Sequence, residues 1–245
     1  MANRLPPPAH KQPVFHAHAN AADWATAAAQ AIASRLQQDL NLAPEVLLLL
    51  SGGSTPAPVY RQLAAQPLDW SRVVISLVDE RLVAPGSDGN NAALLVQAVV
   101  DTPAEAARIW PLVIAGSSLA ACVSQANARL TAAALPISTV VFGMGSDTHT
   151  ASLFPRAPGL AAAFESQQSY VAIDAIGCVG AGHYPLRISL TPSAWSRASA
   201  RFLLITGAGK RRVYQRALAE HDAFAHPVRS AIYGGNSALH VHWCP

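Results

Sequence analysis

The chain has 245 residues with 17 basic and 14 acidic side chains, and hydrophobic residues make up 51% of it. This length and composition exclude a long disordered chain and predict a protein that buries a core without disulfide or metal support. The formal charge of +3 is spread along the sequence, which argues against nucleic acid as a partner. The densest apolar run, Val46 to Leu50, is too short to cross a membrane, and the three cysteines form no Cys-x-x-Cys pair. We therefore expect a cytoplasmic protein with neither a membrane nor a nucleic-acid partner.

The N-terminal sequence contains Pro6-Pro7-Pro8 and lacks the apolar stretch of a secretory signal, so residues 1–12 are expected to form a flexible proline-rich arm. No repeat, low-complexity linker or break in composition interrupts the rest of the chain. We expect residues 13–245 to form a single domain, and a small subdomain within it is compatible with the sequence.

Short apolar runs alternate with segments whose apolar residues have helical spacing. In chain order, the pattern predicts a helix at 21–40, a strand at 45–50, a helix from Pro56, a strand at 73–78, helices at 92–100 and 120–134, strands at 139–142, 187–190 and 201–206, a helix at 210–220 and a strand at 239–243. This alternation predicts an α/β fold with a mostly parallel, Rossmann-like sheet flanked by helices.

Polar clusters follow four of these strands, at 51–55, 79–81, 143–149 and 207–210. In a parallel sheet a ligand binds beyond the carboxyl ends of the strands, so these clusters are candidate parts of one site. The first of them, Ser51-Gly52-Gly53-Ser54-Thr55, precedes a predicted helix in which Pro56 suits the first position and Ser54 or Thr55 the cap. Such a loop is suited to bind phosphate, and the alternative is an ordinary capped turn.

The cluster Gly143-Met144-Gly145 is only superficially similar to a dinucleotide fingerprint, because Thr148 replaces the third glycine and no acidic ribose partner follows. A nicotinamide cofactor is therefore not expected. His149, close to Asp147, is a candidate general base, and the alternative is a loop histidine bonded to backbone.

Charged residues at other predicted element ends have two interpretations each. Asp79-Glu80-Arg81 could supply paired carboxylates with a cation or a solvated strand end, and Arg187 and Lys210 could bind phosphate or remain surface charges. His240, His242 and Cys244 share one face of the last strand and could in principle bind a metal. The apolar residues between them favour a half-buried strand with its polar face outward, so no metal site is expected.

Taken together, these motifs resemble the 6-phosphogluconolactonase family, which belongs to a larger group with glucosamine-6-phosphate deaminases and ribose-5-phosphate isomerases. The resemblance covers nearly the whole chain after residue 13. The segments that carry it are Ser51 to Pro56, Asp79-Glu80-Arg81 with Asn91, Gly143 to Pro155, Arg187 to Thr191, Gly207 with Lys210, and Pro227-Val228-Arg229.

The resemblance implies hydrolysis of 6-phospho-D-glucono-1,5-lactone to 6-phospho-D-gluconate, a step of the oxidative pentose phosphate pathway, without a metal or cofactor. The partner is then a small phosphorylated sugar lactone. His149 is implied as the base that activates water, Asp147 as the group that orients it, and Arg81 as a contact of the sugar acid or the oxyanion. The implied substrate- and phosphate-binding residues are Ser51, Gly52, Gly53, Ser54, Thr55, Asp79, Arg187 and Lys210.

Two other functions remain alternatives. One is a catalytically weak sugar-phosphate sensor, and the other is a related aldose-ketose isomerase or deaminase. The deaminases carry a glutamate shortly after the histidine, where this chain has Leu153-Phe154-Pro155-Arg156. The chain also has Thr148 where the family usually has glycine and Asn90 where it commonly has serine. We expect the loop at Thr148 to adopt a backbone conformation open to threonine.

Overall fold

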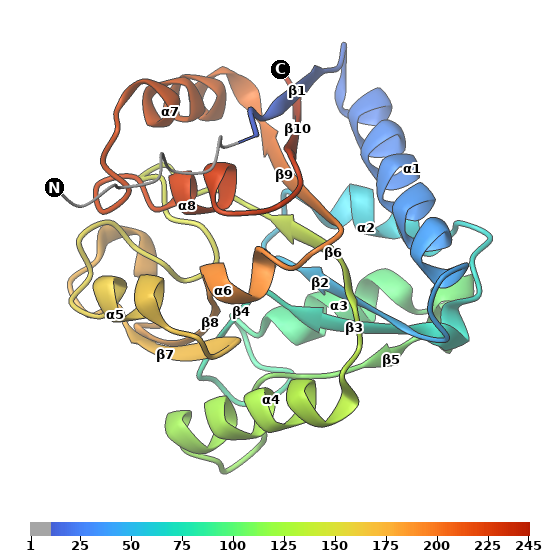
Figure 1. The fold of residues 1–245 in the computed structure, drawn as a ribbon, viewed down its shortest axis with the longest axis horizontal. Coiled ribbons are helices and arrows are strands. Elements are labelled where there is room, and N and C mark those ends of the chain that lie inside the picture. Colours follow the sequence, from blue (N-terminus) through green and yellow to red (C-terminus); the bar gives the residue numbers. More distant parts are fainter. Residues whose placement is uncertain (1–10) are drawn as a thin grey trace, which may run out of the picture.

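The computed structural model describes residues 11–245, and Figure 1 shows a central sheet with helices on both faces and a smaller sheet beside it. All but the last two residues of the expected arm, 1–12, lie outside the described residues. The central sheet has seven strands in the order β1-β10-β9-β6-β2-β3-β5, and every neighbouring pair is parallel. Its strands are β1 (Val14–Ala17), β2 (Val46–Leu50), β3 (Val73–Leu77), β5 (Arg108–Ile109), β6 (Ile137–Phe142), β9 (Ala200–Thr206) and β10 (Leu239–Cys244). The expected mostly parallel α/β fold is therefore confirmed.

A second sheet has three strands in the order β4-β8-β7, and its pairs are antiparallel. Its strands are β4 (Asp79–Arg81), β7 (Tyr170–Asp174) and β8 (Leu186–Leu190). The sequence placed 187–190 with the strands of the main α/β sheet, and this expectation is wrong. Residues 79–81 follow the end of β3 as expected, but they form a strand of the second sheet, and the alternative of a solvated strand end is wrong because Asp79 and Glu80 are buried. Arg81 instead lies opposite Arg187 in the small sheet.

The helices are α1 (Ala21–Leu40), α2 (Ala57–Ala64), α3 (Asn91–Val99), α4 (Leu119–Ala133), α5 (Leu160–Glu165), α6 (Pro192–Trp195), α7 (Gly207–Ala219) and α8 (Val228–Tyr233). In α1, alanines and larger apolar residues at helical spacing are buried against the sheet, which explains its length and amphipathic pattern. The expected cap of α2 is wrong, because Pro56 occupies the cap position and no side chain of Ser54 or Thr55 bonds to the helix. No helix in residues 11–245 is long and apolar enough to cross a membrane.

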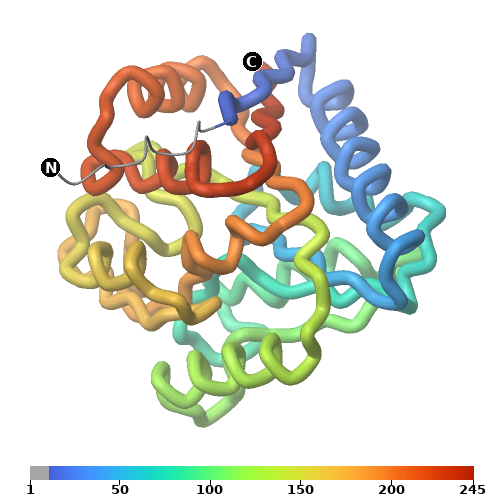
Figure 2. Tube along the Cα trace, viewed as in Figure 1, coloured from blue at the N-terminus to red at the C-terminus, as the bar shows by residue number. Residues whose placement is uncertain are grey.

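The core lies mainly in the middle of the central sheet. Every residue of β2, β3 and β6 is buried, as expected for strands that helices cover on both faces. The ends of the described chain meet at one edge of this sheet, where Figure 2 shows the blue first segment beside the red last strand, and these are β1 and β10.

Four histidines stack where β1 pairs with β10. His16 Nε2 lies 3.1 Å from His240 Nδ1, and His18 Nε2 lies 3.1 Å from His242 Nδ1. The ring of His242 also stacks on those of His16 and His18, with centroids 4.5 and 5.2 Å apart. The expected outward polar face is therefore wrong at His242 and Cys244, which are 3% and 1% exposed, and at His242 the reason is that β1 and α1 cover it. No three His, Cys, Asp or Glu side chains in the described part of the chain are placed to hold a metal ion.

This stack makes the protein sensitive to acid. Burial, with neighbouring His16, His18 and His240, lowers the pKa of His242 to about 3. In the unfolded chain the pKa of His242 is near 6.5, so as the pH falls His242 binds a proton in the unfolded chain before it does so in the folded protein. The free energy of unfolding should fall as pH falls from about 6.5 toward 3, by up to about 1.4 kcal/mol per pH unit. Asp23 is the acidic group that faces the stack, and it acts on His18.

Urea titrations at several pH values test this prediction. The His242→Leu variant should show a shallower loss of stability in acid than the wild type. The His183→Leu variant is a matched control because His183 is exposed, and its slope should equal that of the wild type. An unchanged slope in His242→Leu would contradict the prediction.

Candidate active site

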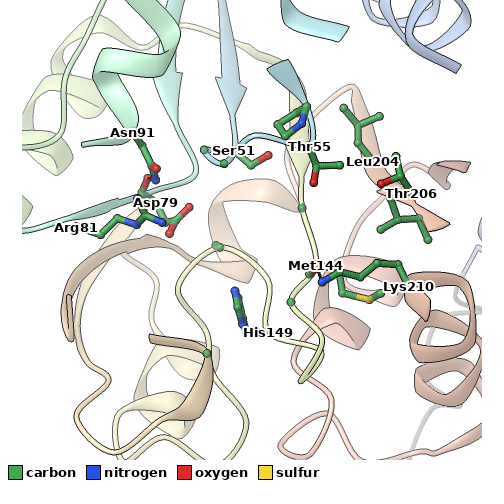
Figure 3. Close-up of a pocket in the computed structure, with 18 of the residues that line it drawn as sticks. Ser51, Thr55, Asp79, Arg81, Asn91, Met144, His149, Leu204, Thr206 and Lys210 are labelled. Carbon is green, nitrogen blue, oxygen red and sulfur yellow. Dashed lines mark hydrogen bonds between the residues drawn. The ribbon is translucent and has the colours of Figure 1, made fainter. Parts of the chain in front are cut away.

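A cavity of about 250 Å³ opens at the carboxyl ends of β2, β6 and β9, and the small sheet forms its opposite wall. This volume suits one small metabolite. Nine of the predicted site residues line it, namely Ser51, Gly52, Gly53, Thr55, Asp79, Arg81, His149, Arg187 and Lys210. The other two do not: Ser54 is exposed, and Asp147 is bonded to His149 Nδ1. Figure 3 shows Arg81 with Asp79 on one side, Lys210 on the other and His149 between them.

The loop after β6 brings Asp147 and His149 together. Asp147 Oδ1 lies 2.6 Å from His149 Nδ1 and also accepts a bond from the His149 backbone N–H at 3.1 Å. Burial acts to raise the pKa of Asp147, but the hydrogen bonds and charge of His149 outweigh it and lower that pKa. Because an ionised carboxylate can only accept, Nδ1 carries a proton. Nε2 has no hydrogen-bond partner in residues 11–245 and is available as a base.

The Phe154 ring packs against His149, and Arg187 in turn packs on the Phe154 ring. The Phe154 ring packs on His149 with centroids 4.6 Å apart, and the Arg187 guanidinium lies 5.6 Å from the centre of the same Phe154 ring. Phe154 is fully buried, so it cannot move aside without opening the core. The imidazole is therefore held on two sides, by a carboxylate and by packing.

Thr148 has a positive φ of 74°, so the expectation of a backbone conformation open to threonine is wrong. A β-branched residue in this region costs about 1–2 kcal/mol. The Thr148 side chain offsets that cost, because it is fully buried and its hydroxyl lies 3.2 Å from His226 Nδ1. His226 is held in turn by Glu220, whose carboxylate lies 2.6 Å from His226 Nε2. Thr148 O also accepts the Val228 N–H at 3.0 Å. These bonds attach the loop after β6 to His226 and to the start of α8.

The Thr148 hydroxyl should therefore contribute to stability. Thr148→Val keeps the shape of the side chain but leaves His226 Nδ1 without its partner, and we expect it to lower the free energy of unfolding by about 1–3 kcal/mol. Thr148→Ser keeps the hydroxyl and should lose less. Urea denaturation of the three proteins measures the difference, and a Val variant at least as stable as the Ser variant would refute this account.

The carboxylate of Asp79 and the guanidinium of Arg187 are both buried at the cavity wall. Asp79 Oδ2 accepts the Ser152 hydroxyl at 2.6 Å and lies 3.8 Å from Arg187 Nη1. Burial lowers the pKa of Arg187 while Asp79 acts to raise it, and arginine still remains charged. Arg187 Nη2 also donates to the carbonyl of Ala181 at 2.7 Å. Arg187 is thus both a cavity cation and an anchor for the β7–β8 connection.

Glu80 is fully buried, and its carboxylate joins β4 to the start of α3. Its fully buried carboxylate accepts the backbone N–H groups of Arg81, Asn91 and Ala92, each at 2.8 Å, and the Asn90 side chain at 3.0 Å. Burial raises the pKa of Glu80 to about 7, against the effect of these backbone donors. Asn90 also caps α3 through a bond to the Ala93 N–H at 3.0 Å. The carboxylate therefore positions Arg81 and Asn91 at the cavity.

Asn91 was part of the sequence motif but received no role there. Its Nδ2 donates to the backbone carbonyl of Asp79 at 3.0 Å, which fixes Oδ1 toward Gly52. A Cβ at position 52 would lie 2.0 Å from that oxygen, so only glycine fits. The contact joins segments 39 residues apart in sequence, and only the adjacent glycines of the 51–55 loop hinted at it.

The opposite side of the cavity carries Lys210 and the 51–55 loop. Lys210 lies in the first turn of α7, and its Nζ donates to the carbonyl of Met144 at 2.6 Å. Burial lowers the pKa of Lys210, and the charge of Asp147 acts to raise it. The Tyr60 hydroxyl donates to the Ser51 carbonyl at 2.9 Å, and the two hydroxyls lie 3.1 Å apart. The cavity thus has three cationic side chains and one carboxylate at its wall, which suits an anionic ligand.

Comparison with known proteins gives a consistent result. Residues 19–243 match the family model described as glucosamine-6-phosphate isomerases/6-phosphogluconolactonase. The chain is 44% identical to a 6-phosphogluconolactonase of Xylella fastidiosa, over 91% of this chain and 92% of that protein. It is 34% identical to a 6-phosphogluconolactonase of Rhizobium meliloti, over 94% and 98%. A crystal structure of a 6-phosphogluconolactonase from Shewanella baltica superposes with a TM-score of 0.88 at 31% identity, covering 96% of this chain and 99% of that one.

Proposed function

The chain belongs to the family of glucosamine-6-phosphate isomerases and 6-phosphogluconolactonases, and on this premise we propose that it hydrolyses 6-phospho-D-glucono-1,5-lactone to 6-phospho-D-gluconate. The observation that carries the proposal is the Asp147–His149 pair, which presents an unoccupied Nε2 to a cavity rich in cationic side chains. The names of the relatives at 44% and 34% identity support the same activity. The step belongs to the oxidative pentose phosphate pathway and takes place in the cytoplasm.

The chemistry follows from the position of the proton on His149. Nε2 takes a proton from water, and the water oxygen attacks the lactone carbonyl carbon. The resulting oxyanion collapses, the bond between that carbon and the ring oxygen breaks, and the imidazolium returns its proton to the ring oxygen. Asp147 stabilises the imidazolium between these two transfers. A positioned base of this kind contributes about 10²–10⁴ to the rate.

Substrate orientation follows from the separation of the cations. Lys210 and the Gly52–Gly53 backbone bind the 6-phosphate on one side of the cavity, and on the other side Arg81 and Arg187 contact the sugar acid or the developing oxyanion. Binding of the remote phosphate places the carbonyl near His149 and so contributes to catalysis rather than only to affinity. Ser54 does not line the cavity, so its role in binding remains a prediction from the sequence.

The structure offers no specific support for the two alternatives. A silent sensor was suggested by Thr148, yet the Asp147–His149 bond forms with Thr148 in place. A deaminase needs an acid shortly after the histidine, whereas Leu153 and Phe154 are buried and apolar at those positions.

Replacing the base tests the proposal. His149→Asn removes the free Nε2, and kcat for lactone hydrolysis should fall at least about 100-fold. The phosphate-binding groups are untouched, so 6-phosphogluconate should still bind. Formation of 6-phosphogluconate is measured from freshly made lactone after subtraction of the spontaneous rate.

His183→Asn serves as the control, because His183 is an exposed histidine and its loss should leave kcat unchanged. Full turnover in His149→Asn would refute the role of this base. Binding of 6-phosphogluconate by a wild type that does not turn over would favour the sensor, and ammonia release from glucosamine 6-phosphate would favour the deaminase.

A further inference from the structure

Two glycines from different segments lie against the Asp147–His149 pair. A Cβ at Gly145 would lie 2.2 Å from His149 Nδ1 and 2.4 Å from Asp147 Oδ1. A Cβ at Gly180 would lie 2.5 Å from Asp147 Oδ2 and 2.7 Å from His149 Nδ1. Real Cβ atoms essentially never come within 3.0 Å of a heavy atom that is not close to them in the chain. Any larger residue at position 180 must therefore displace the pair or the segment that carries it.

Backbone conformation does not explain the glycine at 180. Two other glycines of the β7–β8 connection, Gly177 and Gly182, have φ values of 81° and 59°, which favour glycine. Gly180 is not among the residues with positive φ, so other residues could adopt its conformation. Glycine is required at position 180 because the Asp147 carboxylate and the His149 imidazole occupy the space that a Cβ would need.

The segment around Gly180 is anchored and does not readily move away. Arg187 donates from Nη2 to the Ala181 carbonyl at 2.7 Å and from Nε to the Tyr184 carbonyl. Ala181 is 3% exposed, whereas Val179 on the other side of the glycine is 96% exposed. The same guanidinium packs on Phe154, which contacts His149. One cation therefore ties both the segment and the imidazole ring to the small sheet.

We propose that Gly180 and Ala181 form a wall beside the catalytic pair, where Gly180 also lines the cavity, and that Gly180 is a positioning residue, whose missing side chain lets this wall pack against the Asp147–His149 hydrogen bond. The proposal rests on the proposed function for the part that concerns the rate. The contact itself does not depend on which substrate the cavity takes.

The test is the Gly180→Ala variant. We expect kcat for lactone hydrolysis to fall by about 10- to 100-fold, because a misplaced catalytic group costs rates of this order. KM should change less than about twofold, because the groups proposed to bind phosphate lie across the cavity.

Two controls separate this effect from a general loss of structure. Gly159→Ala adds a methyl group at a glycine with a φ of −86°, where the new Cβ would lie 3.9 Å from Ile173 Cδ1, an ordinary contact distance. Ile176→Ala trims an exposed side chain of the β7–β8 connection outside the wall. Both should keep the kcat and KM of the wild type. The proposal is wrong if Gly180→Ala also keeps them.

A double-mutant cycle covers a variant that folds poorly. In an Asp147→Ala background the carboxylate is gone and no longer holds the imidazole against position 180, so adding Gly180→Ala should cost less stability and activity than in the wild type. An equal cost in both backgrounds, or a double variant that fails to fold when Asp147→Ala alone folds, would overturn the proposal.

A measurement without substrate distinguishes this idea from the proposed function. The side-chain ¹⁵N resonances of His149 should change in Gly180→Ala and stay unchanged in Gly159→Ala. If the wild type lacks lactonase activity but these resonances respond as expected, the wall is supported and only the proposed function fails. Unchanged resonances in Gly180→Ala would refute the wall.

Discussion

The hydrogen bond of 2.6 Å between Asp147 and His149 is the interaction on which the site depends. It leaves Nε2 of a neutral imidazole as the base. In the loop that carries this pair, Thr148 adopts a left-handed backbone conformation. Glycines at positions 145 and 180, from two chain segments, leave the space that the hydrogen-bonded pair occupies. A strained residue in a buried, bonded position is typical of functional loops, where the surrounding structure determines the conformation.

The fold places this pair between two sets of charged groups. The parallel strands direct the 51–55 loop and the start of α7 to one side of the cavity, as expected at the carboxyl ends of such strands. The small antiparallel sheet brings Arg81 and Arg187 to the other side, in register with each other. The buried carboxylate of Glu80 fixes β4 to α3 and so gives Arg81 a defined position. A rigid arrangement of cations around a base is what an anionic lactone requires.

Local patterns in the sequence were sufficient to predict much of this arrangement. The apolar runs of β2, β3 and β6 are buried on both faces, and the polar clusters after them do line the cavity. The small sheet was missed because β4 is only three residues long and all three are charged. The wall at Gly180 and the contact between Gly52 and Asn91 depend on residues far apart in the chain, so a local pattern such as the adjacent glycines of the 51–55 loop could not identify the partner. The stack at His242 was missed for the same reason, since it needs β1 beside β10.

The most direct test of this account is the tautomer of His149 in the wild-type protein, read from its side-chain ¹⁵N chemical shifts at neutral pH. The account predicts a proton on Nδ1, bonded to Asp147, and an unprotonated Nε2. It also predicts that Asp147→Asn disturbs this pattern. A proton on Nε2 in the neutral wild-type imidazole would contradict it, because that nitrogen could then take no proton from water.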